Sequence, residues 1–469
     1  MIHRRVNQML TKEQLHTLLD LGLKTGADFS EIFLEDTYRG TISVNNGDVI
    51  SVSSGNTFGV GVRLLKGIDE VYGYSNDTSY ASIEKLMKTL SGSFKGNANQ
   101  AKPLGEKQPF TYTIKIPHHA MTPEQKSKTL IELSNIIKNH DDKIIQAGAT
   151  LIEWEQKVLI ANSNGIYQDD IRTYTRAALT AVAQDGQLMQ DAYDAPGRAM
   201  GFELFDAIDF KALAKEVAES VMTYLYADNM EPQEMPVVIH NGFGGVIFHE
   251  AVGHPLETSA VSKGLSPFAG KLGQKVASEL VTAYDNGDEA DQWGRTNFDD
   301  EGKKTQKNLL IEKGILKGYL SDYRSGKRMN YESTGSARRQ NYKYPPTSRM
   351  NTTYIENGTE NYEDIIKDTK YGLFAKKLGG GTVNPATGEY NFAVMEGYMI
   401  EDGKLTKPVR GAMLIGHGAD TIQLIDRVAN NKSYGQGMCG AASGSIPTDV
   451  GQPTIRVSKM LVGGQGGNK

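Results

Sequence analysis

The chain has 469 residues, of which 39% are hydrophobic and 23% are charged, so it can fill the cores of two or three domains and is not a disordered protein. Its 51 glycines favour many tight turns and a large share of β-structure. A net charge of −5 supplies no basic field, so we expect no direct nucleic-acid partner. The single cysteine, Cys439, excludes an internal disulfide and favours a reducing compartment.

The first residues carry Arg4 and Arg5, as a signal peptide can, but charged residues interrupt the segment that follows: Lys12, Glu13 and Asp20. Nothing elsewhere approaches the roughly 18 unbroken apolar residues of a membrane span. We therefore expect a cytoplasmic protein that has no membrane partner.

Helices and strands alternate in the first part of the chain. A capping-box sequence at residues 11–14 predicts a helix, because leucines follow it at helical spacing. Residues 30–73 predict several strands, and Asn46-Gly47 between alternating runs predicts a hairpin turn. A second helix is predicted near residues 80–91.

The alternation continues after a polar connection at residues 95–120. Thr122-Pro123 predicts the start of another helix, since proline is tolerated at the first helical position. Strands are predicted through residues 144–204, and residues 205–227 predict one long amphipathic helix.

The second half is dominated by strand and turn patterns. After a boundary near residues 229–232, an apolar strand at 236–240 and one short helix are predicted, then mostly strands to the end. This contrast predicts an α+β fold with an N-terminal α/β domain at residues 1–230 and a β-rich C-terminal domain at residues 231–469. The candidate metal site lies in the second domain.

The most informative motif is His249-Glu250-x-x-x-His254. Two histidines one helical turn apart can bind one zinc ion, and the glutamate beside the first can act as general base. A spacing of five residues corresponds to about 140° on an ideal α-helix, which would point the histidines apart. Gly253 and Pro255 bracket the second histidine, and they favour a π-like turn or a helix end there.

Catalytic zinc sites commonly use three protein ligands and keep one position open. The third candidate is Cys439, because a thiolate binds zinc strongly and the glycines around it allow close backbone approach. A small buried side chain is the ordinary alternative for a free cysteine. Glu257 and His417 remain competing third ligands.

Several segments resemble the TldD/PmbA family, and within it the TldD branch that keeps the metal motif. They are HEAVGHPLE at 249–257, DDEGKKTQKNLLIEKGILKGYL from 299, GSARRQNY from 335, LGGGTVNPATGEYNF from 378, and MCG at 438–440 followed by VGQPTIRV. The resemblance covers nearly the whole chain.

The resemblance implies a zinc metallopeptidase that cleaves unfolded or leader-type peptides. It places the metal ligands on His249, His254 and Cys439, and the general base on Glu250. It also implies a dimer, either with a second copy or with a paralogue that lacks the metal motif. One departure is Pro255, where related chains often have glycine; proline stiffens the exit from the helix.

Two functions of different classes follow from these residues. The first is a peptidase in which zinc and Glu250 hydrolyse a peptide bond held as an added β-strand. The alternative is a non-catalytic interaction or modulator protein with a structural zinc site. Structural zinc sites usually have four protein ligands, and three convincing candidates are present, which favours the peptidase.

Overall fold

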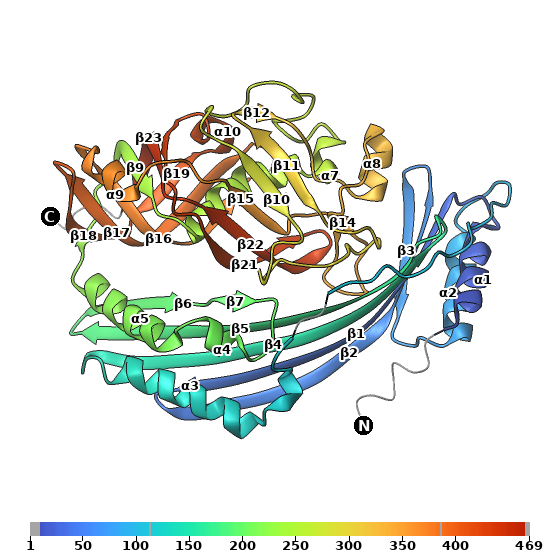
Figure 1. The fold of residues 1–469 in the computed structure, drawn as a ribbon, viewed down its shortest axis with the longest axis horizontal. Coiled ribbons are helices and arrows are strands. Elements are labelled where there is room, and N and C mark those ends of the chain that lie inside the picture. Colours follow the sequence, from blue (N-terminus) through green and yellow to red (C-terminus); the bar gives the residue numbers. More distant parts are fainter. Residues whose placement is uncertain (1–9, 112–113, 385–386, 465–469) are drawn as a thin grey trace.

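The N-terminal part of the chain forms one long, curved antiparallel sheet (Figure 1). The structure is a computed structural model and describes residues 10–111, 114–384 and 387–464. The elements of this part are α1 (Lys12–Leu23), β1 (Phe29–Asn45), β2 (Asp48–Lys66), β3 (Asp69–Ser75), α2 (Tyr80–Ser91), α3 (Pro123–Lys138), β4 (Ile144–Asn162), β5 (Tyr167–Asp185), β6 (Leu188–Asp194), β7 (Gly197–Arg198), α4 (Leu204–Ala207) and α5 (Phe210–Leu225). The strands pair in the order β3-β2-β1-β4-β5-β6, with β7 beside β5.

Local signals place most of these elements. Thr11 and Thr122 form capping boxes at the starts of α1 and α3, as predicted. Asn46-Gly47 makes the predicted hairpin turn, and both residues adopt positive φ. The single long helix expected at 205–227 is wrong, because the side chain of Asp209 accepts hydrogen bonds from two backbone N–H groups and starts α5 separately from α4.

The two faces of the N-terminal sheet have different partners, because successive side chains of a strand point to opposite faces. On β1, Ile32 packs with α1 and α2, and Ile42 packs with α3 and α5. Phe33 and Glu35, on the opposite face, contact Tyr342 of the C-terminal part. Helices therefore cover one face, and the C-terminal part covers a portion of the other.

The C-terminal part contains two larger sheets. Its elements are β8 (Asp228–Asn229), β9 (Gln233–Ile239), α6 (Val246–Phe248), α7 (Thr258–Val261), β10 (Ala283–Asn286), β11 (Lys307–Glu312), β12 (Ile315–Leu316), α8 (Tyr323–Met329), β13 (Ala337–Arg338), β14 (Thr347–Ser348), β15 (Thr352–Ile355), α9 (Tyr362–Lys367), β16 (Tyr371–Val383), β17 (Glu389–Glu401), β18 (Lys404–Arg410), β19 (Met413–His417), α10 (Gly418–Thr421), β20 (Ile425–Val428), β21 (Ser433–Ala441), β22 (Gly444–Gln452) and β23 (Ile455–Gly463). One sheet has the order β12-β11-β10-β15-β22-β21. In the other, β16-β9-β23-β19-β17 closes into a ring because β16 also pairs with β17.

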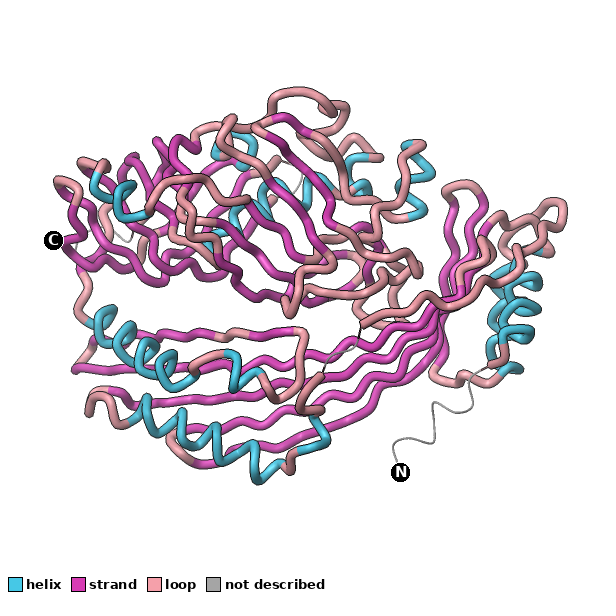
Figure 2. The backbone as a smooth tube through the Cα atoms, in the orientation of Figure 1, coloured by secondary structure: helices cyan, strands magenta, loops and turns pink. Residues whose placement is uncertain are grey.

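The fold is α+β with a β-rich C-terminal part, as predicted, but the expectation of one short helix there is wrong. Figure 2 shows several short helices among long loops in this part. The largest cluster of buried apolar side chains in the described residues belongs to both C-terminal sheets and to the segment that contains His249. The domain boundary at residue 230 stays a prediction.

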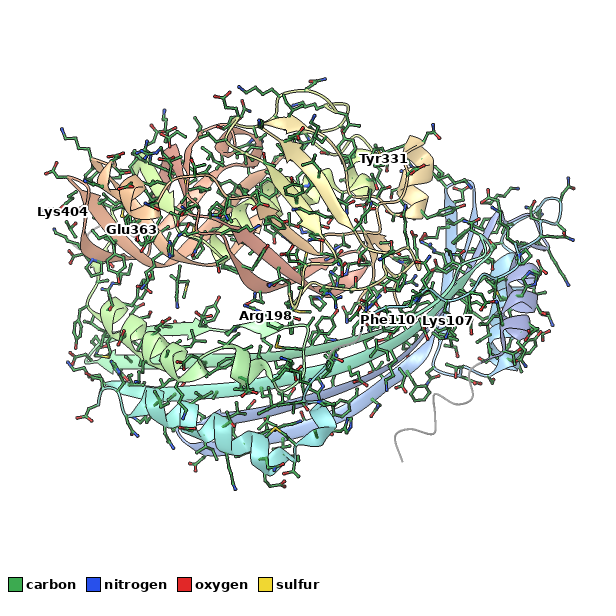
Figure 3. All side chains as sticks on the ribbon, viewed as in Figure 1. Lys107, Phe110, Arg198, Tyr331, Glu363 and Lys404 are labelled. Atoms are coloured by element: carbon green, nitrogen blue, oxygen red, sulfur yellow. The ribbon has the colours of Figure 1, made fainter. Side chains whose placement is uncertain are left out.

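Buried ion pairs join the N-terminal sheet to the C-terminal part. Arg63 of β2 lies 2.9 Å from Glu31 and 2.7 Å from Glu301, and Arg172 of β5 lies 2.7 Å from Asp300. Figure 3 shows Arg198 of β7 on the side of the sheet that faces the C-terminal strands. The described part of the chain contains no helix that is long and apolar enough to cross a membrane.

Candidate metal centre

The two motif histidines lie on one side of a helical segment between the C-terminal sheets. After α6 the backbone widens into a π-helical turn at His249–Gly253, in which the N–H of His254 donates to the carbonyl of His249. A hydrogen bond between residues five apart places them one above the other, whereas an α-helix would separate their side chains. Of the two expected arrangements, a π-like turn or a helix end, the structure has the π-like turn.

Packing and backbone chemistry hold this turn. A Cβ on Gly253 would lie 2.2 Å from Sδ of Met350, which is fully buried, so only glycine fits there without a shift. Phe248 and Val252 are buried in the large apolar cluster and anchor the other side of the segment. Pro255 follows within a short 3-10 turn at His254–Leu256, where its missing N–H costs little.

Cys439 reaches the histidines from β21, far away in the sequence. It pairs with Ile446 of β22, and its side chain is buried. Arg349, fully buried, donates to the backbone carbonyl of Cys439, to Ser443 Oγ at 3.0 Å and to the Gly444 carbonyl at 2.9 Å. Arg349 therefore fixes the tip of the β21–β22 hairpin next to the thiol.

Three ligand atoms converge at this point. Cys439 Sγ lies 3.3 Å from His249 Nε2 and 3.1 Å from His254 Nε2, and the three ligand atoms lie within 4.8 Å of one another. Zinc bond lengths and a tetrahedral angle would separate each nitrogen from the sulfur by about 3.6 Å. A small opening of the cluster would therefore admit the ion, and two imidazoles with one thiolate are donors that suit zinc.

Glu250 stands at the more open side of the cluster. Its Oε2 lies 3.7 Å from Nε2 of His254, and 29% of its side chain is exposed. The ligand side chains are more enclosed, since His249 is 2% and Cys439 is 4% exposed. Glu250 can thus contact solvent and the ligand cluster together, as a general base must.

The competing third ligands lie elsewhere. Glu257 is buried, and its Oε1 contacts the far nitrogen of His254, Nδ1, at 3.0 Å rather than the ligand cluster. His417 ends β19 and lies 3.5 Å from Asp420. Within the described residues, the group that can hold a metal ion consists of His249, His254 and Cys439.

The charges around Cys439 favour the thiolate form of its side chain. Burial opposes ionisation of the Cys439 thiol, but His254 and His249 outweigh burial and hold the pKa of Cys439 well below its usual value. Burial likewise disfavours the imidazolium of His254, yet Glu257 and Cys439 raise the pKa of His254 well above its usual value. Metal binding requires the neutral form of an imidazole and the charged form of a thiol, so proton release accompanies binding.

Sequence reasoning missed two residues that support the ligands. Arg349 lies within the segment RMNTTY, and no local pattern links it to Cys439, 90 positions away. The sequence offers Glu257 as a competing third ligand, whereas in the structure it is a partner of His254. Its position three residues after His254 was the available signal for a contact within one helical turn.

Comparisons with known proteins agree with this architecture. Three family models match the chain: PmbA/TldA metallopeptidase domain 1 at residues 30–92, the central domain at 116–225 and the C-terminal domain at 232–464. The crystal structure of TldE from Thermococcus kodakarensis superposes with a TM-score of 0.75 at 20% identity, covering 96% of this chain and 100% of that chain. A Thermotoga maritima protein, described as a candidate modulator of a DNA gyrase, gives a TM-score of 0.79 at 18% identity, covering 96% and 99%. At these sequence identities, the two structures are evidence for the fold alone.

Closer relatives carry peptidase names. The Metalloprotease TldD homolog of Haemophilus influenzae is 31% identical over 480 residues, covering 99% of this chain and all of that protein. A metalloprotease of Methanocaldococcus jannaschii is 28% identical, covering 96% of this chain and 99% of that protein. Matching family models across the three domains and a relative above 30% identity over the full length place this chain in the PmbA/TldD family of metallopeptidases.

Proposed function

We propose that this protein is a zinc-dependent peptidase with His249, His254 and Cys439 as metal ligands and Glu250 as general base. The observation that carries the proposal is the convergence of two imidazole nitrogens and one sulfur beside a partly exposed carboxylate. Three ligands leave a position open for water or substrate, as in catalytic zinc sites.

The chemistry that zinc supplies when bound is Lewis acidity at the scissile carbonyl and at water. Glu250 accepts a proton from the attacking water at its carboxylate, while the water oxygen bonds to the carbonyl carbon. When the carbon–nitrogen bond breaks, Glu250 returns this proton to the leaving amine. Burial of His249 and Cys439 keeps bulk water away from the ligand side of the reaction.

The edge of the six-stranded sheet offers a place for an extended substrate. β21 ends the strand order, and its Met438 and Gly440, on either side of Cys439, are exposed. A peptide that adds as a strand is bound through its backbone, which any unfolded sequence can provide. Unfolded or leader-type peptides are therefore the proposed substrates.

The alternative function, a non-catalytic modulator with structural zinc, receives less support. Such a site is usually closed by four protein ligands, and the described residues bring three together. A structural site would also gain nothing from the partly exposed Glu250.

The proposed assembly is a dimer in the reducing cytoplasm, with a second copy or with a paralogue lacking the metal motif. A single cysteine that must remain a thiolate suits that compartment. Solution scattering of the active preparation should give the mass of two chains. A one-chain mass at concentrations where peptide cleavage persists would contradict the dimer.

The test of the function is the Glu250→Gln variant with an unstructured peptide. Glutamine keeps the shape of the side chain but cannot accept a proton at neutral pH. We expect unchanged zinc content and cleavage slowed by about 10²–10⁴-fold. Equal rates for wild type and variant at equal zinc occupancy would disprove the mechanism.

A further inference from the structure

Glu257 is a buried carboxylate whose position is not explained by the proposed chemistry. It is 5% exposed and lies at the start of the short helix α7, yet its side chain makes no capping hydrogen bond. A buried carboxylate needs a partner to offset lost hydration. The hydrogen-bond partner of this side chain is Nδ1 of His254, at 3.0 Å.

The backbone around Glu257 is held from both sides. Its N–H donates to the carbonyl of His254 at 3.1 Å, which closes the 3-10 turn between the two residues. On the other side, Thr258 N–H donates to the Leu320 carbonyl at 2.8 Å, and Leu320 N–H donates to the Leu256 carbonyl at 3.0 Å. The carboxylate is thus presented to His254 by a fixed segment and not by a mobile loop.

The opposite nitrogen of the same ring faces the ligand cluster. Nε2 of His254 lies 3.1 Å from Cys439 Sγ, so the contact at Nδ1 orients the ring toward the sulfur. A carboxylate accepts a hydrogen bond from Nδ1–H, which leaves the Nε2 lone pair free for a metal. His249 differs, because its buried Nδ1 has no hydrogen-bond partner among the described residues.

We propose that Glu257 is a positioning residue that selects the tautomer and the ring orientation of His254 for metal binding. It acts through His254 and does not itself bind the ion. The inference rests on the proposed metal role of His254. The asymmetry between the rings predicts that a hydrogen-bonded carboxylate supports the site through His254, whereas His249 has no such bond at Nδ1.

The experiment measures metal affinity in competition with a chelator, together with the visible spectrum of the Co²⁺-loaded protein. Glu257→Gln keeps an acceptor oxygen but loses the charge, and we expect about 10-fold weaker binding; Glu257→Ala should approach 100-fold. The thiolate-to-cobalt absorption should stay unchanged, because Cys439 and both histidines remain the ligands. Glu396→Gln is the matched control, since Glu396 is a buried carboxylate of β17 that pairs with Lys376 away from the site.

The outcomes separate this inference from the proposed function. Wild-type affinity in both Glu257 variants would overturn the positioning role, as would a Co²⁺ spectrum showing a changed ligand set, which would make Glu257 a ligand. A wild-type protein that binds no metal would instead overturn the proposed function. If Glu257→Ala does not fold, Glu257→Gln alone decides, and its melting temperature without metal is compared with that of the Glu396→Gln control.

Discussion

At the residue scale, the centre depends on one side chain that has no substitute in the chain. Cys439 is the single cysteine, and both motif histidines lie within hydrogen-bonding distance of its sulfur. The imidazoles lower the pKa of the thiol against the effect of burial, which favours the thiolate form that binds metals. In the proposed site, the cysteine would supply the negative charge that balances the ion.

Replacing Cys439 with Ser should weaken metal binding more than any change outside the ligand set. A hydroxyl keeps the approximate size of the thiol but is a poor zinc ligand. We expect a loss beyond the about 10–100-fold that substitution of a supporting residue causes. Metal content after dialysis measures this loss, with Met438→Leu on the same strand as control. Full zinc occupancy in Cys439→Ser would remove Cys439 from the site.

A second residue-scale prediction concerns acid stability. His118 is buried and forms a hydrogen bond with Thr175 at 2.8 Å. Burial, with a smaller effect of Lys126, lowers the pKa of His118 from the ordinary 6.5 to about 4. Between these values the unfolded chain binds a proton that the folded chain does not, so stability falls as pH falls. The pKa shift of His118 changes the free energy of unfolding by about 3 kcal/mol at most.

Urea unfolding at pH 7 and pH 4.5 tests the role of His118. Because glutamine does not titrate, His118→Gln should show a smaller loss of unfolding free energy between the two pH values than wild type. The exposed His140→Gln should behave as wild type. The same pH dependence in all three proteins would show that His118 does not set acid stability.

At the element scale, the π-helical turn places His249 and His254, five residues apart, on the same side of the helical segment. A side chain at position 253 would meet the buried Met350, and Gly253 avoids that contact. The apolar side chains before the turn are buried, so the segment cannot move away from Met350 without losing that packing.

Gly253→Ala should therefore disturb the site without altering a ligand. The added methyl group would lie 2.2 Å from Met350 Sδ, and overpacking of this kind costs about 1–3 kcal/mol. We expect a lower melting temperature and reduced metal content. Gly253→Ala combined with Met350→Ala frees the space and should recover part of the metal content. If the single variant binds metal normally, the close packing is not essential to the ligand geometry.

At the scale of the whole molecule, the two halves are joined by charges buried between them. Glu31 of β1 lies between Arg63 of β2, at 2.9 Å, and Arg339 of the C-terminal part, at 2.6 Å. Glu301 completes the group at 2.7 Å from Arg63. These pairs give little net stability relative to an apolar contact, but removing one member leaves a buried partner with too few opposite charges.

Arg63→Met should destabilise the protein by about 3–5 kcal/mol, because Glu301 would stay buried without its cation and Glu31 would keep Arg339 alone. The double variant with Glu301→Gln should lose less than the sum of the single variants. Denaturant unfolding measures both. Lys12→Ala, which removes an exposed pair with Glu106, is expected to cost less than about 1 kcal/mol. Equal losses in Arg63→Met and Lys12→Ala would refute the structural role of the network.

Sequence alone determined the features that depend on neighbouring residues. Local hydrogen bonds and backbone preferences form the capping boxes at Thr11 and Thr122 and the Asn46-Gly47 turn. These features involve only a few consecutive residues, so the sequence predicts them directly. The split between α4 and α5 was missed because the capping role of Asp209 competes with a continuous apolar pattern. The α+β class and the family resemblance also followed from sequence patterns.

Only the tertiary structure decided which candidates meet. The motif predicted that His249 and His254 need an unwound turn, but the space under Gly253 depends on Met350, about a hundred residues later. Cys439, Glu257 and His417 were alternatives that spacing could not rank, because a ligand shell is assembled from strands and turns distant in sequence. The order of strands in the six-stranded sheet places Cys439 next to the histidines. Glu257 contacts the far nitrogen of His254, and His417 lies beside Asp420.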